Sequence, residues 1–343
     1  MPGVEFNFLP TIVGSMPQTD PLAACTQIVH YLRDIPAWPQ LPKKSFQENM
    51  YVQYSQGFPG VVVEEDEEKI YIDRNRGLEA LERLYAAYLE NDFTKYAISP
   101  EYAAGLHQFL SVTTQSPLAV KGQVTGPITW GLTVTDDTGK GILYDDFLGD
   151  AVPKLLRLKA AWQEKELSRF SKNTIIFVDE PYMSAFGSVS MMLSRDQVIN
   201  LLEEVFSGIG GLKGVHCCGN TDWSLLLETS VDIISFDTYN YAQSLSLYPV
   251  ELKKFLERGG TVAWGIVPNE EDLLAKETVA SLKDRLEEAM APFTRQDIRF
   301  RQLIAQGLLT PSCGLASLAT EEAAARVLEL LSELSETIRK RYT

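Results

Sequence analysis

The chain has 343 residues, of which 45% are hydrophobic and 22% are charged, and its formal net charge is −15. This is the composition of a globular enzyme, long enough for one large domain or two small ones. The excess of acidic residues argues against a nucleic-acid-binding protein, because such proteins use Lys and Arg to neutralise phosphates. No hydrophobic run approaches the ~20 residues of a membrane span, and no secretory signal is visible, so we expect a cytoplasmic protein. Its four cysteines are then expected to be thiols or metal ligands and not disulfides.

Short hydrophobic runs alternate with longer amphipathic segments along the whole chain. The runs predicted as strands are 11–14, 60–63, 118–123, 174–178, 212–218, 232–236, 261–267 and 308–313. The segments with helical periodicity are 78–88, 101–113, 144–171, 195–209, 223–228, 247–258, 270–290 and 321–341. This alternation predicts an α/β fold, a single (β/α)8 TIM barrel over residues 1–343, with an insertion between the first two strands. The alternative is a doubly wound open sheet, but no Gly-x-Gly-x-x-Gly turn follows the first strand.

Polar residues follow each predicted strand at its carboxyl end, which is where the active site of such barrels lies. In chain order they are Gly14-Ser15, Glu64-Glu65, Thr125-Gly126-Pro127, Asp179-Glu180-Pro181, His216 with Cys218, Asp237-Thr238, Pro268-Asn269 and Cys313-Gly314. Randomly placed polar residues would not be concentrated in this way at the carboxyl ends of the strands, which form one rim of the barrel. The sequence therefore predicts an active site at this rim.

The predicted rim contains a set of zinc ligands. His216 and Cys218 lie two residues apart in a predicted strand, so their side chains share one face, and Cys313 ends another strand. Zinc takes about four ligands from Cys, His and carboxylate, and Asp237 is the expected fourth, although it could instead cap the next helix. Cysteines buried as small hydrophobic residues are the alternative. Three protein ligands and one exchangeable position are typical of a catalytic zinc, which can hold a substrate thiol as a thiolate.

The other rim residues suit an amino acid as substrate. The hydroxyl and backbone N–H groups of Gly14 and Ser15 can receive a carboxylate. Asp179, with Glu64 or Glu65, can receive an ammonium group through charge-assisted hydrogen bonds. The alternative for Asp179 is a turn residue before a helix.

Several segments resemble motifs of the cobalamin-independent methionine synthase family, in the same order along the chain. They are PTIVGSMPQT at 10–19, TGPIT at 125–129, VDEP at 178–181, HCC at 216–218, DIISFDT at 232–238 and PSCGL at 311–315. The resemblance is to the catalytic half of these enzymes and implies a (β/α)8 barrel that binds zinc and homocysteine. It implies that His216, Cys218 and Cys313 are zinc ligands, that Ser15 lies at the homocysteine carboxylate, and that Asp179 lies at its amino group. Asp237 stands where the family usually has glutamate.

Two departures from the family pattern concern the methyl donor. The full-length enzymes carry a second barrel that helps to hold folate, and this chain has no room for it. The family also places a histidine after the seventh strand, to protonate the folate leaving nitrogen, and residues 264–269 contain none. These departures predict a methylated corrinoid such as methylcobalamin as donor, presented by a corrinoid protein, with homocysteine as acceptor. The alternatives are coenzyme M as acceptor, a folate donor, uroporphyrinogen decarboxylation, and a zinc or corrinoid carrier without enzymatic activity.

Overall fold

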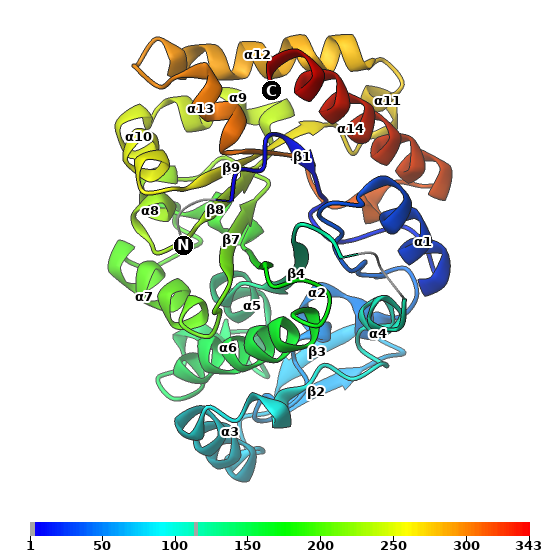
Figure 1. Cartoon of the computed structure of the whole chain (residues 1–343). Coiled ribbons are helices and arrows are strands. Elements are labelled where there is room, and N and C mark those ends of the chain that lie inside the picture. Colours follow the sequence, from blue (N-terminus) through cyan, green and yellow to red (C-terminus); the bar gives the residue numbers. More distant parts are fainter. Residues whose placement is uncertain (1–3, 113–115) are drawn as a thin grey trace.

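A curled parallel sheet lies at the centre of the computed structural model, which describes residues 4–112 and 116–343 (Figure 1). Its strand order is β1-β10-β9-β8-β7-β6-β4, and every pairing in it is parallel. The strands are β1 Leu9–Pro10, β4 Val120–Thr125, β6 Thr174–Asp179, β7 Leu212–Cys217, β8 Ile233–Phe236, β9 Thr261–Val267 and β10 Gly307–Pro311. The predicted α/β fold is confirmed, and the architecture is TIM-barrel-like.

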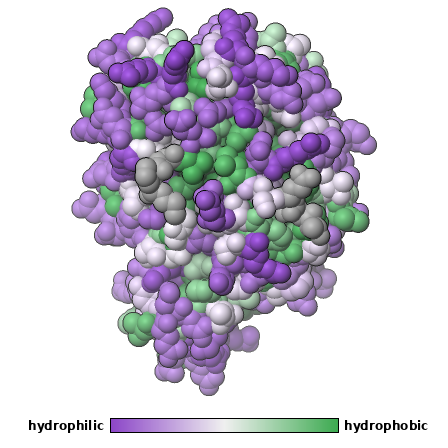
Figure 2. Space-filling model, in the orientation of Figure 1, coloured by the Kyte–Doolittle hydropathy of each residue, from purple (hydrophilic) through white to green (hydrophobic). Residues whose placement is uncertain are grey.

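Helices surround this sheet (Figure 1). They are α1 Pro21–Tyr31, α2 Met50–Gln53, α3 Leu78–Glu90, α4 Ala104–Ser111, α5 Pro127–Thr133, α6 Leu148–Leu167, α7 Arg195–Phe206, α8 Trp223–Glu228, α9 Thr238–Ser246, α10 Pro249–Glu257, α11 Glu271–Leu274, α12 Val279–Thr294, α13 Phe300–Ala305 and α14 Glu321–Tyr342. Within the described ranges, no helix has both the length and the hydropathy needed to cross a bilayer. The surface seen in Figure 2 is mostly hydrophilic, with hydrophobic residues gathered near the centre of that face.

The strands that the sequence predicts best are buried on both faces. Every residue of β6 and of β9 is buried, as expected for parallel strands covered by helices. The predicted helix 270–290 is instead two helices, because Thr278 and Ser281 form a capping box that begins α12. The predicted helix 101–113 ends at Ser111, and residue 113 lies outside the described residues.

Residues 60–63 do not form the second strand of the central sheet, contrary to the prediction. Val61–Glu64 (β2) pairs antiparallel with Lys69–Ile72 (β3), and Thr135–Asp136 (β5) completes a separate three-stranded sheet. The three valines favour a strand, but strand propensity does not specify which strand is the partner. β2 is only half-buried, unlike the strands of the central sheet.

An extended segment, residues 34–40, lies between the edge strands β1 and β4. Isolated parallel bridges join Ala37 to Lys121 of β4 and Gln40 to Ser15, which follows β1. The prolines at positions 36 and 39 have no N–H to donate, which prevents a regular ladder on this segment. The eight regular strands of the prediction are therefore not all present in the described residues.

Lys159 of α6 is a buried charge that weakens the fold. Its side chain is fully buried, and its Nζ has no hydrogen-bond partner among the described residues. Burial lowers the pKa of this amine to about 7. When folding lowers the pKa of a lysine, the folded state is destabilised because the charged form is disfavoured there. This destabilisation is largest below the folded-state pKa, and it disappears as the pH rises through the unfolded-state pKa of about 10.4.

Replacing Lys159 with methionine is therefore expected to stabilise the protein. The gain in free energy of unfolding should be on the order of 2 kcal/mol at pH 6.5 and clearly smaller at pH 9.5. Urea denaturation at the two pH values measures it, with Lys165→Met, an exposed lysine of the same helix, as the control. A loss of stability at pH 6.5 would contradict the assignment of Lys159 as an uncompensated charge.

Candidate metal centre and pocket

The carboxyl ends of neighbouring strands bring the predicted site residues together. In the register of the sheet, Asp179 of β6 lies beside His216 of β7, and His216 lies beside Ser235 of β8. Because neighbouring residues in register point to the same face of a sheet, the three side chains form a row. This row is the floor of the candidate site.

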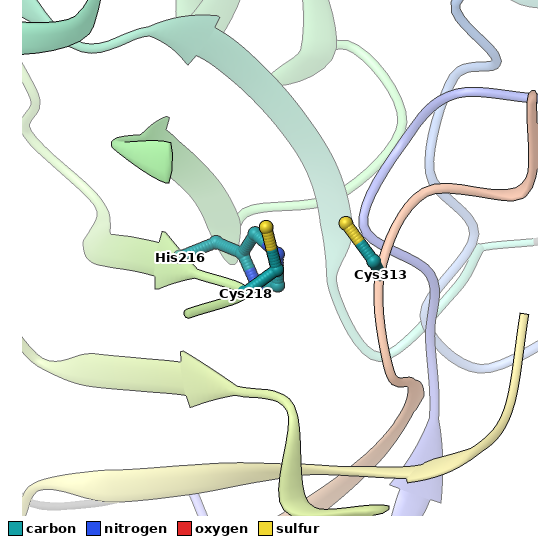
Figure 3. A group of neighbouring side chains, drawn as sticks. All are labelled: His216, Cys218 and Cys313. Atoms are coloured by element: carbon teal, nitrogen blue, oxygen red, sulfur yellow. The ribbon is translucent and has the colours of Figure 1, made fainter. Parts of the chain in front are cut away.

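His216, Cys218 and Cys313 form a cluster of potential metal ligands. Their ligand atoms all lie within 4.8 Å of one another. In Figure 3 the two cysteine sulfurs and the imidazole ring point towards one another, with Cys313 on a separate segment of chain. His216 and Cys218 come from the end of β7, and Cys313 follows β10. Cys217 between them is fully buried, and its thiol contacts its own turn at Gly219 O, 3.6 Å away.

The hydrogen bonds of His216 leave one ring nitrogen available to a metal. Nδ1 lies 3.0 Å from the hydroxyl of Ser235. Nε2 is buried and has no hydrogen-bond partner among the described residues. A buried polar atom without a partner is costly, and a metal-ligating histidine usually bonds through its other nitrogen to a neighbour that fixes the ring. The donor set of one imidazole and two thiols therefore fits Zn²⁺.

The two thiols are electrostatically coupled. The hydrogen bond from Cys313 and the nearby His216 lower the pKa of Cys218, whereas the interaction with Cys218 and burial raise the pKa of Cys313. One sulfur thus carries negative charge more readily than the other. A cation held between them would favour the thiolate form of both, because a coordinated thiol is deprotonated.

Asp237 serves as a helix cap in this structure. One carboxylate oxygen accepts a hydrogen bond from the backbone N–H of Asn240 at 2.9 Å, and the other accepts from its side-chain amide at 2.7 Å. These contacts begin α9. Among the described residues, the cluster of atoms within 4.8 Å does not include Asp237. Its role as the fourth ligand therefore stays a prediction, and it would require at least one of these bonds to be exchanged.

The metal cluster opens into a pocket of about 460 Å³. Besides the cluster itself, the polar residues that line it include Ser15, Glu48 and Asp179. Met50 and Tyr51 contribute to its apolar part. Pockets of this size, apolar with a few convergent polar groups, are typical small-molecule sites.

Asp179 is an acid with an unused acceptor at the pocket. It is buried, and its Oδ1 has no hydrogen-bond partner among the described residues. Burial raises the pKa of this carboxyl to about 6, although the nearby ammonium of Lys121 opposes the rise. Lys121 is itself buried and donates to Val13 O at 2.6 Å. A cationic ligand group at Oδ1 would supply the missing hydrogen bond and stabilise the carboxylate.

Glu48 is the second acid of the pocket, and it was not predicted from the sequence. Its Oε1 accepts from Ala104 N at 2.7 Å, and its Oε2 accepts from Leu41 N at 3.2 Å and from the Gln53 amide at 3.3 Å. Burial raises the pKa of this carboxyl to about 7. Glu48 ends a 3-10 helix of three residues, Phe46–Glu48, which is too short to give a periodic pattern in the sequence. Its contacts are made by residues far apart in the sequence.

Glu64 and Glu65 are not among the residues that line the pocket, and the structure does not bring them to the metal cluster. Glu64 ends β2, where it lies 3.8 Å from the ammonium of Lys69 and accepts a hydrogen bond from Tyr71 at 3.2 Å. The two residues lie at the end of a strand of the accessory sheet and not of the central one. Their expected place at the rim depended on that strand and is not observed.

Ser15 and its neighbours are tightly packed beside the Cys313 turn. The carbonyl of Ser15 accepts from Leu315 N at 2.8 Å. A Cβ at position 314 would overlap the Ser15 hydroxyl oxygen, so a larger residue there would force this hydroxyl to turn away. A Cβ at position 14 would lie 2.8 Å from the side chains of both Gln40 and Gln123. The chain at Gly14 and Ser15 is therefore held in place on both sides.

The fold is similar to that of a solved protein, a B12-independent methionine synthase from Shewanella sp. W3-18-1 in complex with selenomethionine. The match has a TM-score of 0.58 and 16% sequence identity, and covers 97% of this chain and 98% of that chain. A GH113 β-mannanase from Alicyclobacillus acidocaldarius matches with a TM-score of 0.43 and 11% identity over 98% of both chains. No protein-family model matches the sequence, and no curated protein sequence matches it. At this identity, the first match shows a shared fold.

Proposed function

We propose that this protein is a zinc-dependent methyltransferase that transfers a methyl group from a methylated corrinoid to the thiol of homocysteine, giving methionine. The observation that carries the proposal is a single pocket lined by three zinc-type ligands and two buried acids. The thiols and imidazole suit a metal that binds sulfur, and the acids suit the ammonium group of an amino acid. The shared fold with a methionine synthase supports the same reading.

The candidate site residues have the following roles in this proposal. His216, Cys218 and Cys313 would hold zinc, with Asp237 as a fourth ligand before substrate enters. Asp179 and Glu48 would bind the ammonium group between two carboxylates, and its charge would lower the pKa of both. The hydroxyl of Ser15 and the backbone beside Gly14 would receive the carboxylate. These contacts leave the thiol of homocysteine directed at the metal ligands.

When bound, zinc would supply a Lewis acid that keeps the substrate sulfur deprotonated at neutral pH. The residues of the chain do the positioning: they fix both charged ends of the amino acid, so that its sulfur faces the donor methyl group in line. A sulfur–carbon bond forms while the bond from the methyl group to the donor breaks, and the electron pair leaves with the donor. No covalent intermediate with the protein is needed, and the rate comes from positioning and thiol activation.

The donor is proposed from the residues at the pocket. The chain has three histidines, and only His216 is among those that line the pocket; His30 lies on α1 and His107 on α4. Since His216 is assigned to the metal, no imidazole is left to protonate the leaving nitrogen of a folate. Cob(I)alamin leaves from methylcobalamin without such a proton.

A folate donor is the second candidate, and one observation favours it. The Shewanella protein is named B12-independent, and 98% of its chain is covered by this one. A chain of this length is therefore compatible with a donor other than a corrinoid, so chain length does not favour a corrinoid donor. Coenzyme M as acceptor is less favoured, because it has no ammonium group for Asp179 and Glu48.

A donor and acceptor comparison tests the proposal. Zinc-loaded protein is given homocysteine with either methylcobalamin or methyltetrahydrofolate, and methionine is measured. Turnover with methylcobalamin, and preference for homocysteine when coenzyme M competes, is the expected result. Turnover with methyltetrahydrofolate alone would show that the donor is a folate and not a corrinoid. Preference for coenzyme M would show that homocysteine is not the acceptor. Metal or corrinoid binding without turnover of any donor would indicate a carrier protein.

A further inference from the structure

The side chain of Asn269 makes its hydrogen bonds to the turn that contains Cys313. Its Oδ1 accepts a hydrogen bond from the Ser312 hydroxyl at 2.9 Å. Its Nδ2 donates to the carbonyl of Gly314 at 3.0 Å and to the hydroxyl of Ser317 at 3.2 Å. The amide therefore binds the residues on both sides of Cys313 and leaves Cys313 free to face the metal cluster.

An irregularity in the sheet brings Asn269 to this place. The pairing of β9 and β10 changes register, with Thr310 opposite Gly265 but Pro311 opposite Val267, so β9 has one extra residue at this point. Beyond the bulge, Ser312 N donates to Val267 O at 2.8 Å. The chain after β9 thus runs alongside the Cys313 turn. Bulges of this kind often occur next to active sites, where they redirect side chains.

The other side of the same turn contacts the proposed carboxylate site. Leu315 N donates to Ser15 O, and Gly314 approaches the Ser15 hydroxyl closely. The turn is therefore held between Asn269 on one side and Ser15 on the other. A shift of the turn would move both the third metal ligand and the residue proposed to receive the substrate carboxylate.

We propose that Asn269 is a positioning residue of the metal centre, which fixes the Cys313 turn so that its sulfur meets His216 and Cys218. This inference rests on the metal site of the proposed function. Loss of a residue that orients a metal ligand typically weakens metal affinity by about 10- to 100-fold. Asn269 also lines the pocket, so activity alone would not separate this role from a direct contact with substrate.

The test uses the metal alone as probe, without substrate. Zinc release to a chelator is timed, and the thiolate-to-cobalt charge-transfer absorption is recorded after cobalt substitution. Asn269→Ala removes every side-chain bond to the turn, and Asn269→Asp keeps the size but replaces the two N–H donors facing Gly314 and Ser317. Thr320→Ala is the matched control, because Thr320 caps α14 shortly after the same turn and accepts from Ala323 N at 3.1 Å, away from the cluster.

Both Asn269 variants are expected to release zinc about 10- to 100-fold faster than the wild type and to lose part of the charge-transfer absorption. Thr320→Ala should lose some stability, because the cap of α14 is removed, but keep the spectrum and the release rate. Asn269 variants that match Thr320→Ala in both readouts would overturn the inference. A wild-type protein that binds neither metal would instead overturn the proposed metal site, so the two failures are distinguishable.

Discussion

Replacing Cys218 with serine is expected to remove zinc from the protein and to abolish methionine formation. Cys218 supplies one of two thiols in the cluster, and a serine hydroxyl is a poor zinc ligand near neutral pH because it is not ionised. The loss of affinity should exceed the ~10- to 100-fold that follows from losing a residue that only orients a ligand. Metal analysis after dialysis, with activity measured on the same sample, gives both results.

The neighbouring Cys217 provides the matched control. It is one residue away and fully buried, and its thiol contacts Gly219 O and not the cluster. Cys217→Ser can keep this hydrogen bond, so it should retain bound zinc and most of the activity. Equal zinc contents in the two variants would contradict the assignment of Cys218 as a ligand.

The second large effect is expected from removing the two acids of the pocket. Asp179→Asn and Glu48→Gln keep the shape of each side chain but remove the negative charge. Hydrogen bonds to charged groups contribute about 1.5–3 kcal/mol each, so the KM for homocysteine should rise by about 10- to 100-fold in each variant. The double variant should show a larger rise, and kcat should change less than KM.

A substrate analogue separates this effect from general damage to the site. The compound 4-mercaptobutanoate is homocysteine without its amino group, so it has nothing to offer the two carboxylates. The wild type should use it poorly, and the acid variants should discriminate little between it and homocysteine. If Asp179→Asn impaired the two thiols equally, the acid would not bind the amino group. Glu64→Gln is the control, because Glu64 lies outside the pocket residues.

The same acids predict how homocysteine binding depends on pH. Burial raises the pKa of Glu48 to about 7 and that of Asp179 to about 6. A carboxyl group that becomes protonated loses its attraction for an ammonium group, so the KM for homocysteine should increase as the pH falls from 8 to 6. A pH profile of KM measures this, and Glu48→Gln should weaken the dependence. A KM that is flat over this range in the wild type would contradict the role of Glu48.

The central sheet was predictable because its strands are continuous hydrophobic runs. β6, β7, β8, β9 and β10 appear within two residues of their predicted bounds, and all of their residues except the first two of β7 are buried. The part of the central sheet formed by the N-terminal residues was not predictable in the same way. Prolines interrupt residues 34–40, and the strongest strand signal nearby, Val61–Val63, belongs to the accessory sheet.

The candidate site likewise contains residues that the sequence predicted and residues that it did not. Asp179 and His216 lie at the carboxyl ends of β6 and β7, Cys218 directly follows β7, and the geometry of a parallel sheet brings such positions to one edge. Glu48 ends a three-residue 3-10 helix and Asn269 lies in irregular chain, and both became candidates through contacts with residues that are distant in sequence, Ala104 and Ser312. Glu64 and Glu65 had the expected chemistry but followed the wrong strand. Residue type and spacing predicted the candidate metal cluster, whereas Glu48 became a candidate only from the structure.

The most direct test of the account is the metal dependence of homocysteine methylation. Methionine formation is measured with metal-free protein, with the same protein after one equivalent of zinc, and with zinc-loaded Cys218→Ser, using methylcobalamin as donor. We expect methionine only from the zinc-loaded wild type. Equal methionine formation by the metal-free protein or by the Cys218 variant would contradict the account, because thiol activation by a zinc held at His216, Cys218 and Cys313 would then have no part in the reaction.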